Sequence, residues 1–324
     1  LTIAQSGGAT FGGAVTLSGS LTLTDTDAGD DIIFNGALTA NRLVTAAEGY
    51  NLILNAGGQI TIDTNITSTG ILTIGNDASD SMTFTGGFSS GATGAMNLAG
   101  TLATANNQLD IDRDLNLTAA SIISAGSGDI IIDGTIGGAQ TLNINTTGAT
   151  TINGIISGIT SLTTNAGAGA TGIAANISTV NNQTYFDNVT ISGGNRVLTS
   201  SGGAIFFDGT VNGDAARNLE IDAGSGLTTF DAAVGTAQAL GAITITGSGG
   251  LDLNGIIGAT GGAAGAGSLA VTGASDLGAD VNTSGIQTYT GAVTLSGATR
   301  TLTSTGGSTI TFGNTIDGTQ ALNV

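Results

Sequence analysis

The chain is built from short runs in which aliphatic residues alternate with threonine, asparagine or aspartate. Examples are Leu21–Thr24, Gln59–Asp63 and Ala242–Thr246. A period of two places successive side chains on opposite faces of a strand, so one face of each run meets a core and the other meets water. No run keeps the 3.6-residue period of a helix, and each interior glycine costs a helix about 1 kcal/mol relative to alanine. We therefore predict β-strands throughout.

The strand-like runs are separated by Gly, Asn, Asp and Ser, which tolerate the backbone conformations of tight corners. They start roughly every ten residues, so two or three strands per turn predict coils of about 20–30 residues. The predicted fold class is all-β, a parallel β-helix (β-solenoid), with right-handed winding as the expected form. Proline is missing from the chain, as expected where almost every strand needs its N–H groups for the ladder.

One module recurs along the chain. Gln183–Tyr185 followed by Val189–Gly193 matches Gln287–Tyr289 followed by Val293–Gly297. Such self-similarity is typical of solenoids, in which each coil buries its apolar face only against its neighbours. We predict that residues 1–324 form a single continuous solenoid segment made of degenerate repeats.

The two ends of the sequence fall within the same repeated element. Leu1–Ile3 opens one copy of it, and Leu322–Val324 opens another. Natural arrays end in atypical capping units. The segment is therefore expected to be a fragment of a longer array.

Composition narrows the class of protein. Hydrophobic residues make up 40% of the 324 residues and aromatic residues only 4%, which argues against disorder and favours a thin core of short aliphatic side chains. The absence of Cys excludes disulfides and thiolate metal sites. A formal net charge of −18 with only five arginines predicts no nucleic-acid binding. The apolar runs are too short for membrane insertion, and no signal or anchor pattern is visible.

The repeats resemble the β-strand repeats of very large bacterial exoproteins, such as filamentous-haemagglutinin-like adhesins and giant autotransporter or two-partner-secreted proteins. The resemblance covers essentially the whole chain and lies in the residue pattern of the repeats, not in a functional site. Three units carry it, each in two copies: Gln183–Tyr185 and Gln287–Tyr289, Phe207–Gly213 and Phe312–Gly318, and Gln140–Ile144 and Gln320–Val324.

The resemblance implies a parallel β-helix exported to the bacterial cell surface or the medium, acting in adhesion, biofilm matrix or filament formation. We accordingly expect a structural or adhesive fibre protein that is not an enzyme. Its partners would be further copies, joined end to end or laterally, and host or cell-surface glycans. Without His, Cys or Lys, few side chains remain for catalysis.

An alternative function is a carbohydrate-active β-helix enzyme, because glycoside hydrolysis needs only two carboxylates. Asp110, Asp112 and Asp114 alternate within Leu109–Leu117 and are expected to project from one strand face. Solvated outer-face aspartates are the simpler interpretation. An enzyme should show a groove flanked by acids and aromatics, whereas a fibre should show uniform outer faces.

One acidic turn offers carboxylates of the kind that calcium prefers. It contains Asp25, Asp27, Asp30 and Asp31 beside a glycine. The turn lacks the ligand spacing of an EF-hand and of the nonapeptide calcium repeats, so a plain acidic corner is the competing interpretation. We expect no other cofactor or metal and assign no catalytic residue.

Overall fold

The computed structural model describes residues 1–4, 7–24, 28–91, 93–165, 167–259 and 263–324. Within these ranges every regular element is a β-strand, and no helix is present. The parallel strands stack into a β-solenoid of about 15 turns in all, which confirms the predicted fold class. The chain divides into two compact units, unit 1 (Leu1–Thr160 with Gly167–Gly169) and unit 2 (Ser161–Ala166 with Ala170–Val324).

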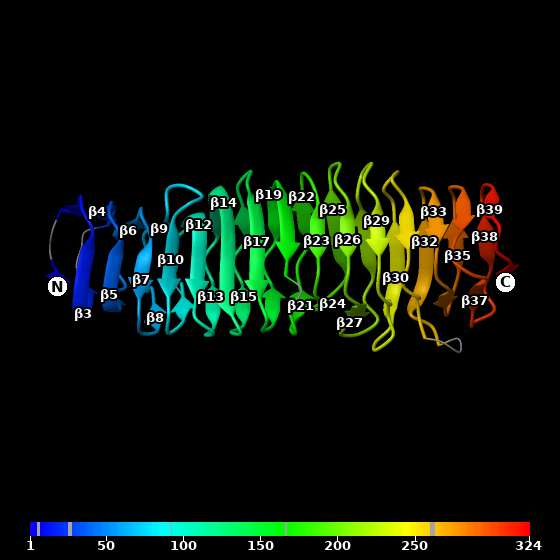
Figure 1. Ribbon diagram of the computed structural model, residues 1–324, viewed down its shortest axis with the longest axis horizontal. Coiled ribbons are helices and arrows are strands. Elements are labelled where there is room, and N and C mark those ends of the chain that lie inside the picture. The colour runs from blue at the N-terminus through cyan, green and yellow to red at the C-terminus, as the bar shows by residue number, and fades with distance from the viewer. Residues whose placement is uncertain (5–6, 25–27, 92, 166, 260–262) are drawn as a thin grey trace. The chain divides into compact units, whose positions relative to one another are not determined.

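In unit 1 the strands form three parallel ladders, in which each strand pairs with its counterpart one turn later (Figure 1). The first ladder contains β2 (Ala9–Phe11), β4 (Asp31–Phe34), β6 (Asn51–Leu54), β9 (Leu72–Ile74), β12 (Met96–Thr104), β14 (Leu115–Gly126), β16 (Ile136–Gly137) and β19 (Ile156–Ile159). The second contains β3 (Val15–Leu23), β5 (Leu38–Thr45), β7 (Gly58–Ile60), β10 (Ser81–Phe84), the C-terminal halves of β12 and β14, and β17 (Thr141–Thr146). The third contains β8 (Thr64–Asn65), β11 (Phe88–Ser89), β13 (Leu109–Ile111), β15 (Ile130–Ile132) and β18 (Thr150–Ile152), and β1 (Thr2–Ile3) pairs with the end of β3.

Within unit 2 the strands likewise form three parallel ladders. The first contains β20 (Ser161–Thr164), β23 (Gln183–Tyr185), β26 (Ile205–Phe207), β29 (Thr228–Phe230), β31 (Leu251–Leu253), β33 (Ser275–Leu277), β36 (Val293–Leu295) and β39 (Ile316–Gly318). The second contains β22 (Ile177–Thr179), β25 (Arg196–Ser200), β28 (Leu219–Asp222), β30 (Leu240–Ile245), β32 (Ala266–Val271), β35 (Gln287–Tyr289) and β38 (Ile310–Phe312). The third contains β21 (Ala170–Ile173), β24 (Asn188–Ile191), β27 (Val211–Gly213), single bridges at Val234 and Ile257, β34 (Val281–Thr283), β37 (Arg300–Ser304) and β40 (Leu322–Asn323).

Coil length varies along the chain. Ser275 pairs with Val293, so that turn takes 18 residues (293 − 275), whereas Leu240 pairs with Ala266 in a turn of 26 (266 − 240). The shortest turns are thus slightly shorter than the predicted 20–30 residues. Because strands fix the height of a coil and loops absorb the extra residues, turns of different length still stack in register.

The core is the inside of the coil, where the aliphatic residues of the two-residue pattern are buried. Rings add to it by stacking on the ring one turn away. In unit 2 the ring of Phe207 lies 5.0 Å from that of Tyr185 and 5.0 Å from that of Phe230, with both pairs stacked. In unit 1 Phe11 stacks on Phe34 at 4.7 Å. Each coil therefore buries its inner face largely against the coils above and below it.

Candidate functional site

The carboxylates singled out in the sequence are not arranged on one strand face. Strand β13 ends at Ile111, with Leu109 and Ile111 fully buried and Asp110 between them on the outer face. Asp112 and Asp114 follow in the turn before β14, and Arg113 between them is 1% exposed. The expectation that Asp110, Asp112 and Asp114 project together from a strand was therefore wrong, because the strand stops one residue after the first of them.

Asp114 interacts with the next turn of the coil. Its Oδ1 accepts hydrogen bonds from the backbone N–H of Thr135 at 2.9 Å and from the Thr135 hydroxyl at 2.7 Å. These bonds hold the pKa of Asp114 below its ordinary value. Its carboxylate thus has a structural partner at the corner.

The structure instead groups Asp110 and Asp112 with Asp133, from the following turn. Ile111 pairs with Ile132, so the residues that follow them, Asp112 and Asp133, stack at the same corner. Carboxylate oxygens of Asp110, Asp112 and Asp133 all lie within 4.8 Å of one another. We call these three residues the acidic cluster.

Asp110 is the least solvated carboxyl group of the acidic cluster. Its Oδ1 is inaccessible to solvent and accepts no hydrogen bond from any residue that the structure describes. Burial raises the pKa of Asp110, and the negative charges of Asp112 and Asp133 raise it further. By contrast, Asp133 is engaged by the next turn, since the Asn153 amide donates a hydrogen bond of 2.6 Å to its Oδ1.

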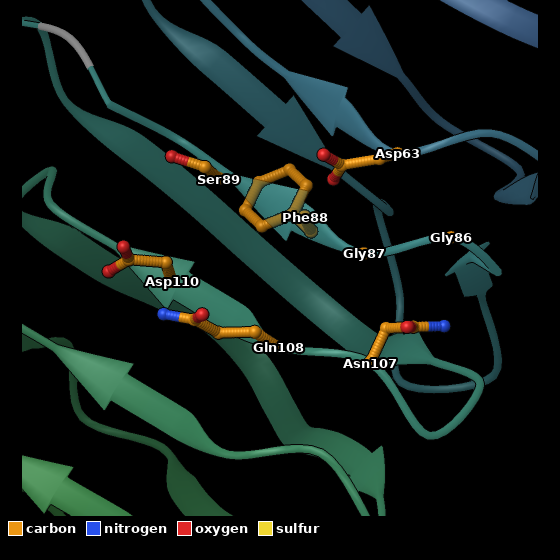
Figure 2. A pocket seen from close by; sticks show the side chains of 8 residues that line it. All are labelled: Asp63, Gly86, Gly87, Phe88, Ser89, Asn107, Gln108 and Asp110. Carbon is orange, nitrogen blue, oxygen red and sulfur yellow. The ribbon is translucent and has the colours of Figure 1, made fainter.

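Two hollows of the surface flank the acidic cluster. Figure 2 shows the first, of about 280 Å³, which Asp63, Phe88 and Asp110 line from three successive turns. The second, of about 620 Å³, is lined by Asp112, Arg113 and Asp114 together with small residues. Phe88 is only 2% exposed, and the second hollow has no aromatic residue in its lining. Neither hollow offers the exposed ring on which a sugar stacks.

The acidic turn considered as a calcium site or a plain acidic corner is only partly described. Asp25 and Asp27 lie outside the described residues. Asp31 begins β4, and its Oδ1 accepts a hydrogen bond of 2.8 Å from the Asn51 amide one turn later. Among the described residues, the acidic cluster brings three carboxylates within reach of one divalent cation.

Arg113 was not expected inside the coil. Its guanidinium donates hydrogen bonds to three backbone carbonyls, those of Ser90 at 2.9 Å, Gly70 at 2.8 Å and Ser68. Burial lowers the pKa of Arg113, and burial raises the pKa of the neighbouring Tyr50 to about 12. The arginine bridges the two preceding turns from within.

Sequence reasoning missed Asp133 and the interior position of Arg113. Asp133 lies 21 residues after Asp112 (133 − 112), so its place in the cluster follows only when the length of that coil is known. The triplet Asp112-Arg113-Asp114 is an ordinary charged turn by composition. A lone arginine carries no signal that it will turn inward.

Comparisons with family models, with curated proteins and with solved structures gave no match. The resemblance to filamentous-haemagglutinin-like exoproteins therefore stays a prediction. Among the described residues, no helix is long and apolar enough to cross a membrane.

Proposed function

We propose that this chain is a structural segment of an extracellular fibre, of the kind found in bacterial surface adhesins, filaments and biofilm matrices. The observation that carries the proposal is the run of parallel ladders within each unit, in which every turn is hydrogen-bonded to the next. Such stacking gives stiffness along the stacking direction, because bending must lengthen many backbone hydrogen bonds at once.

The outer faces support a structural role. Where strands show a two-residue burial pattern, the outward positions are mostly small polar residues, such as Thr39 in β5 and Thr163 in β20. The hollows beside the acidic cluster lack the exposed aromatic residue of a sugar-binding groove. On this proposal the partners are further copies of the chain, stacked end to end or side by side, and glycans bound along the outer faces.

Electron microscopy of the native assembly tests the proposal. We expect long rods with a repeat of about 4.8 Å along the axis, the spacing of stacked strands. Globular particles of fixed size would contradict it. Binding of the purified chain to an array of surface glycans tests the adhesive part separately, and binding to none would leave a scaffold without adhesive activity.

A carbohydrate-active enzyme is the second candidate, favoured by one observation. The acidic cluster combines Asp110, whose pKa is raised, with Asp112, and a pair of unlike carboxyl groups is what glycoside hydrolysis uses. We would incubate the chain with acidic and neutral polysaccharides and measure new reducing ends. Hydrolysis that is lost in Asp110→Asn and kept in Asp31→Asn supports this candidate. No hydrolysis by the wild type excludes these substrates.

Calcium is the cofactor that would fit the fibre proposal, because it links carboxylates of neighbouring turns. We expect about 1 mM calcium, the range bound by extracellular modules, to raise the melting temperature of the wild type. Loss of the rise in Asp110→Asn assigns the ion to the acidic cluster, and loss in Asp31→Asn assigns it to the turn before β4. No rise in the wild type would end the calcium proposal.

A further inference from the structure

Two aspartates lie directly beside each other on the outer face of unit 2. Strands β31 and β33 pair in parallel with Asp252 opposite Asp276 and Leu253 opposite Leu277. The leucines are fully buried, so both carboxyl groups project outward. Neighbouring strands are about 4.8 Å apart, and like charges placed opposite each other destabilise a sheet.

No positively charged side chain forms an ion pair with either aspartate among the described residues. On the same face, Thr229 precedes Asp252 in the ladder and Thr294 follows Asp276. The nearest titratable groups along these strands are Asp231, which follows β29, and Asp317 in β39, and both are acids. Arg300 packs just past β33, where its guanidinium donates to the backbone carbonyl of Gly278. The repulsion between Asp252 and Asp276 is therefore not relieved by a direct ion pair to either carboxyl group.

The two carboxyl groups differ in their hydrogen bonds. The Asn254 amide donates to Asp231 Oδ1 at 2.9 Å and to Asp252 Oδ2 at 3.4 Å. Asp276 Oδ1 is inaccessible to solvent and accepts no hydrogen bond from any described residue. A buried acceptor without a donor costs about 1–3 kcal/mol. The pair thus contains one unsatisfied acceptor and, beside it, a carboxyl group able to become a donor.

We propose that Asp252 takes up a proton on mild acidification and donates a hydrogen bond to Oδ1 of Asp276, forming an acid-strengthened clasp between two turns of unit 2. The protonated carboxyl supplies the missing donor and removes one of the two facing negative charges in the same step. The proton comes from water, and no other group changes. The clasp does not depend on the fibre proposal, since it concerns the stability of one unit.

The direction of the pH effect follows from the electrostatics of Asp252. Burial raises its pKa, the Asn254 hydrogen bond lowers it, and the charges of Asp276 and Asp231 raise it, with a net rise above the ordinary value of 3.8. A carboxyl whose pKa is higher in the folded state binds more protons there than in the unfolded state. Its contribution to stability is therefore complete below pH 3.8 and is lost as the pH rises through the raised value.

The Asp276→Asn variant of the full chain tests the clasp. Its amide resembles the protonated state, because it carries no charge and donates to Asp252. We expect its melting temperature at about pH 7 to exceed that of the wild type by roughly 2 °C or more, and this difference to shrink as the pH falls towards 3.8. The control is Glu220→Gln, which removes an exposed charge from the outer face of β28. Its difference in melting temperature from the wild type should be the same at both ends of this pH range.

A second variant and a direct titration guard against an uninformative loss of folding. Asp252→Asn should also stabilise the chain at neutral pH. In the wild type, the side-chain ¹³C resonance of Asp252 should report a pKa above 3.8, and that pKa should fall in Asp276→Asn. A lower melting temperature of both variants at neutral pH would overturn the proposal, as would an unchanged titration of Asp252. If calcium raised the melting temperature of the wild type at neutral pH and Asp276→Asn abolished that rise, the pair would hold a cation, and the proton clasp would be wrong.

Discussion

The hydroxyl of Tyr185 donates a hydrogen bond of 2.9 Å to Oε1 of Gln183, and both side chains are fully buried. The Gln183 amide in turn donates to the carbonyl of Thr199 at 2.7 Å. Since Gln183 belongs to β23 and Thr199 to β25, the hydrogen bond between them joins two faces of the same coil through its interior. The same arrangement recurs at Tyr289 and Gln287, with a hydrogen bond of 3.2 Å.

Replacing Gln183 by leucine should destabilise the chain more than removing the hydroxyl in Tyr185→Phe. The leucine leaves the buried Tyr185 hydroxyl without its acceptor, at about 1–3 kcal/mol, and the Thr199 carbonyl without its side-chain donor. Tyr185→Phe leaves only one acceptor lacking its donor, at about 1 kcal/mol. Urea unfolding measures both. Thr184→Val, on the outer side of the same strand, is the control, and an equal effect of all three substitutions would contradict the interior bridge.

The Gln-Thr-Tyr unit shows how far sequence reasoning reaches. Its two-residue pattern correctly predicts a strand with Gln and Tyr on one face. The two copies, however, occupy different ladders, since Gln183–Tyr185 pairs with β26 of the first and Gln287–Tyr289 with β38 of the second. The sequence module and the coil thus have different lengths. That difference depends on loop lengths, which the two-residue pattern does not encode.

The buried arginine should resist replacement by any residue that cannot reach three carbonyls. In Arg113→Met the carbonyls of Ser68, Gly70 and Ser90 lose their donors, which outweighs the relief of removing a buried charge. We expect a loss of about 2–4 kcal/mol in the free energy of unfolding. Arg42→Met, at an exposed position of β5, is the control. A neutral Arg113→Met would mean that water satisfies these carbonyls equally well.

Glycine is required where successive corners stack without room for a side chain. A Cβ on Gly154 would lie 1.8 Å from the carbonyl oxygen of Gly134, and one on Gly134 would lie 1.9 Å from that of Arg113. Gly154→Ala therefore forces the two turns apart, and we expect a loss of about 1–3 kcal/mol. Gly12→Ala has nothing within 4 Å of the new atom and should be close to neutral. Equal stability of the two variants in urea unfolding would contradict this packing.

The acidic cluster marks where prediction of the site fails. Asp110 and Asp112 were recognised as candidate carboxylates, but the partner that completes the group is Asp133, from the next turn. The local sequence of Asp110 to Asp114 does not indicate which residue of the next turn stacks on Asp112, because that depends on the number of residues in one coil. The strand pattern predicts which side chains face outward, and only the register shows which of them meet.

The exposed pair of Asp214 and Arg217 should show the opposite pH behaviour to Asp252. The Arg217 guanidinium, 2.6 Å from Asp214 Oδ1, and the backbone N–H of Gly193 hold the pKa of Asp214 below 3.8. Its contribution to stability is therefore present above pH 3.8 and is lost as the pH falls through the lowered value. In Arg217→Gln the pKa of Asp214 should rise towards 3.8, as followed by side-chain ¹³C resonances. Asp77 is the internal control, because hydrogen bonds from Ser79 lower its pKa without any arginine. A shift at both sites would mean that the substitution perturbs the chain generally, whereas no shift at Asp214 would show that Gly193 alone holds the carboxylate.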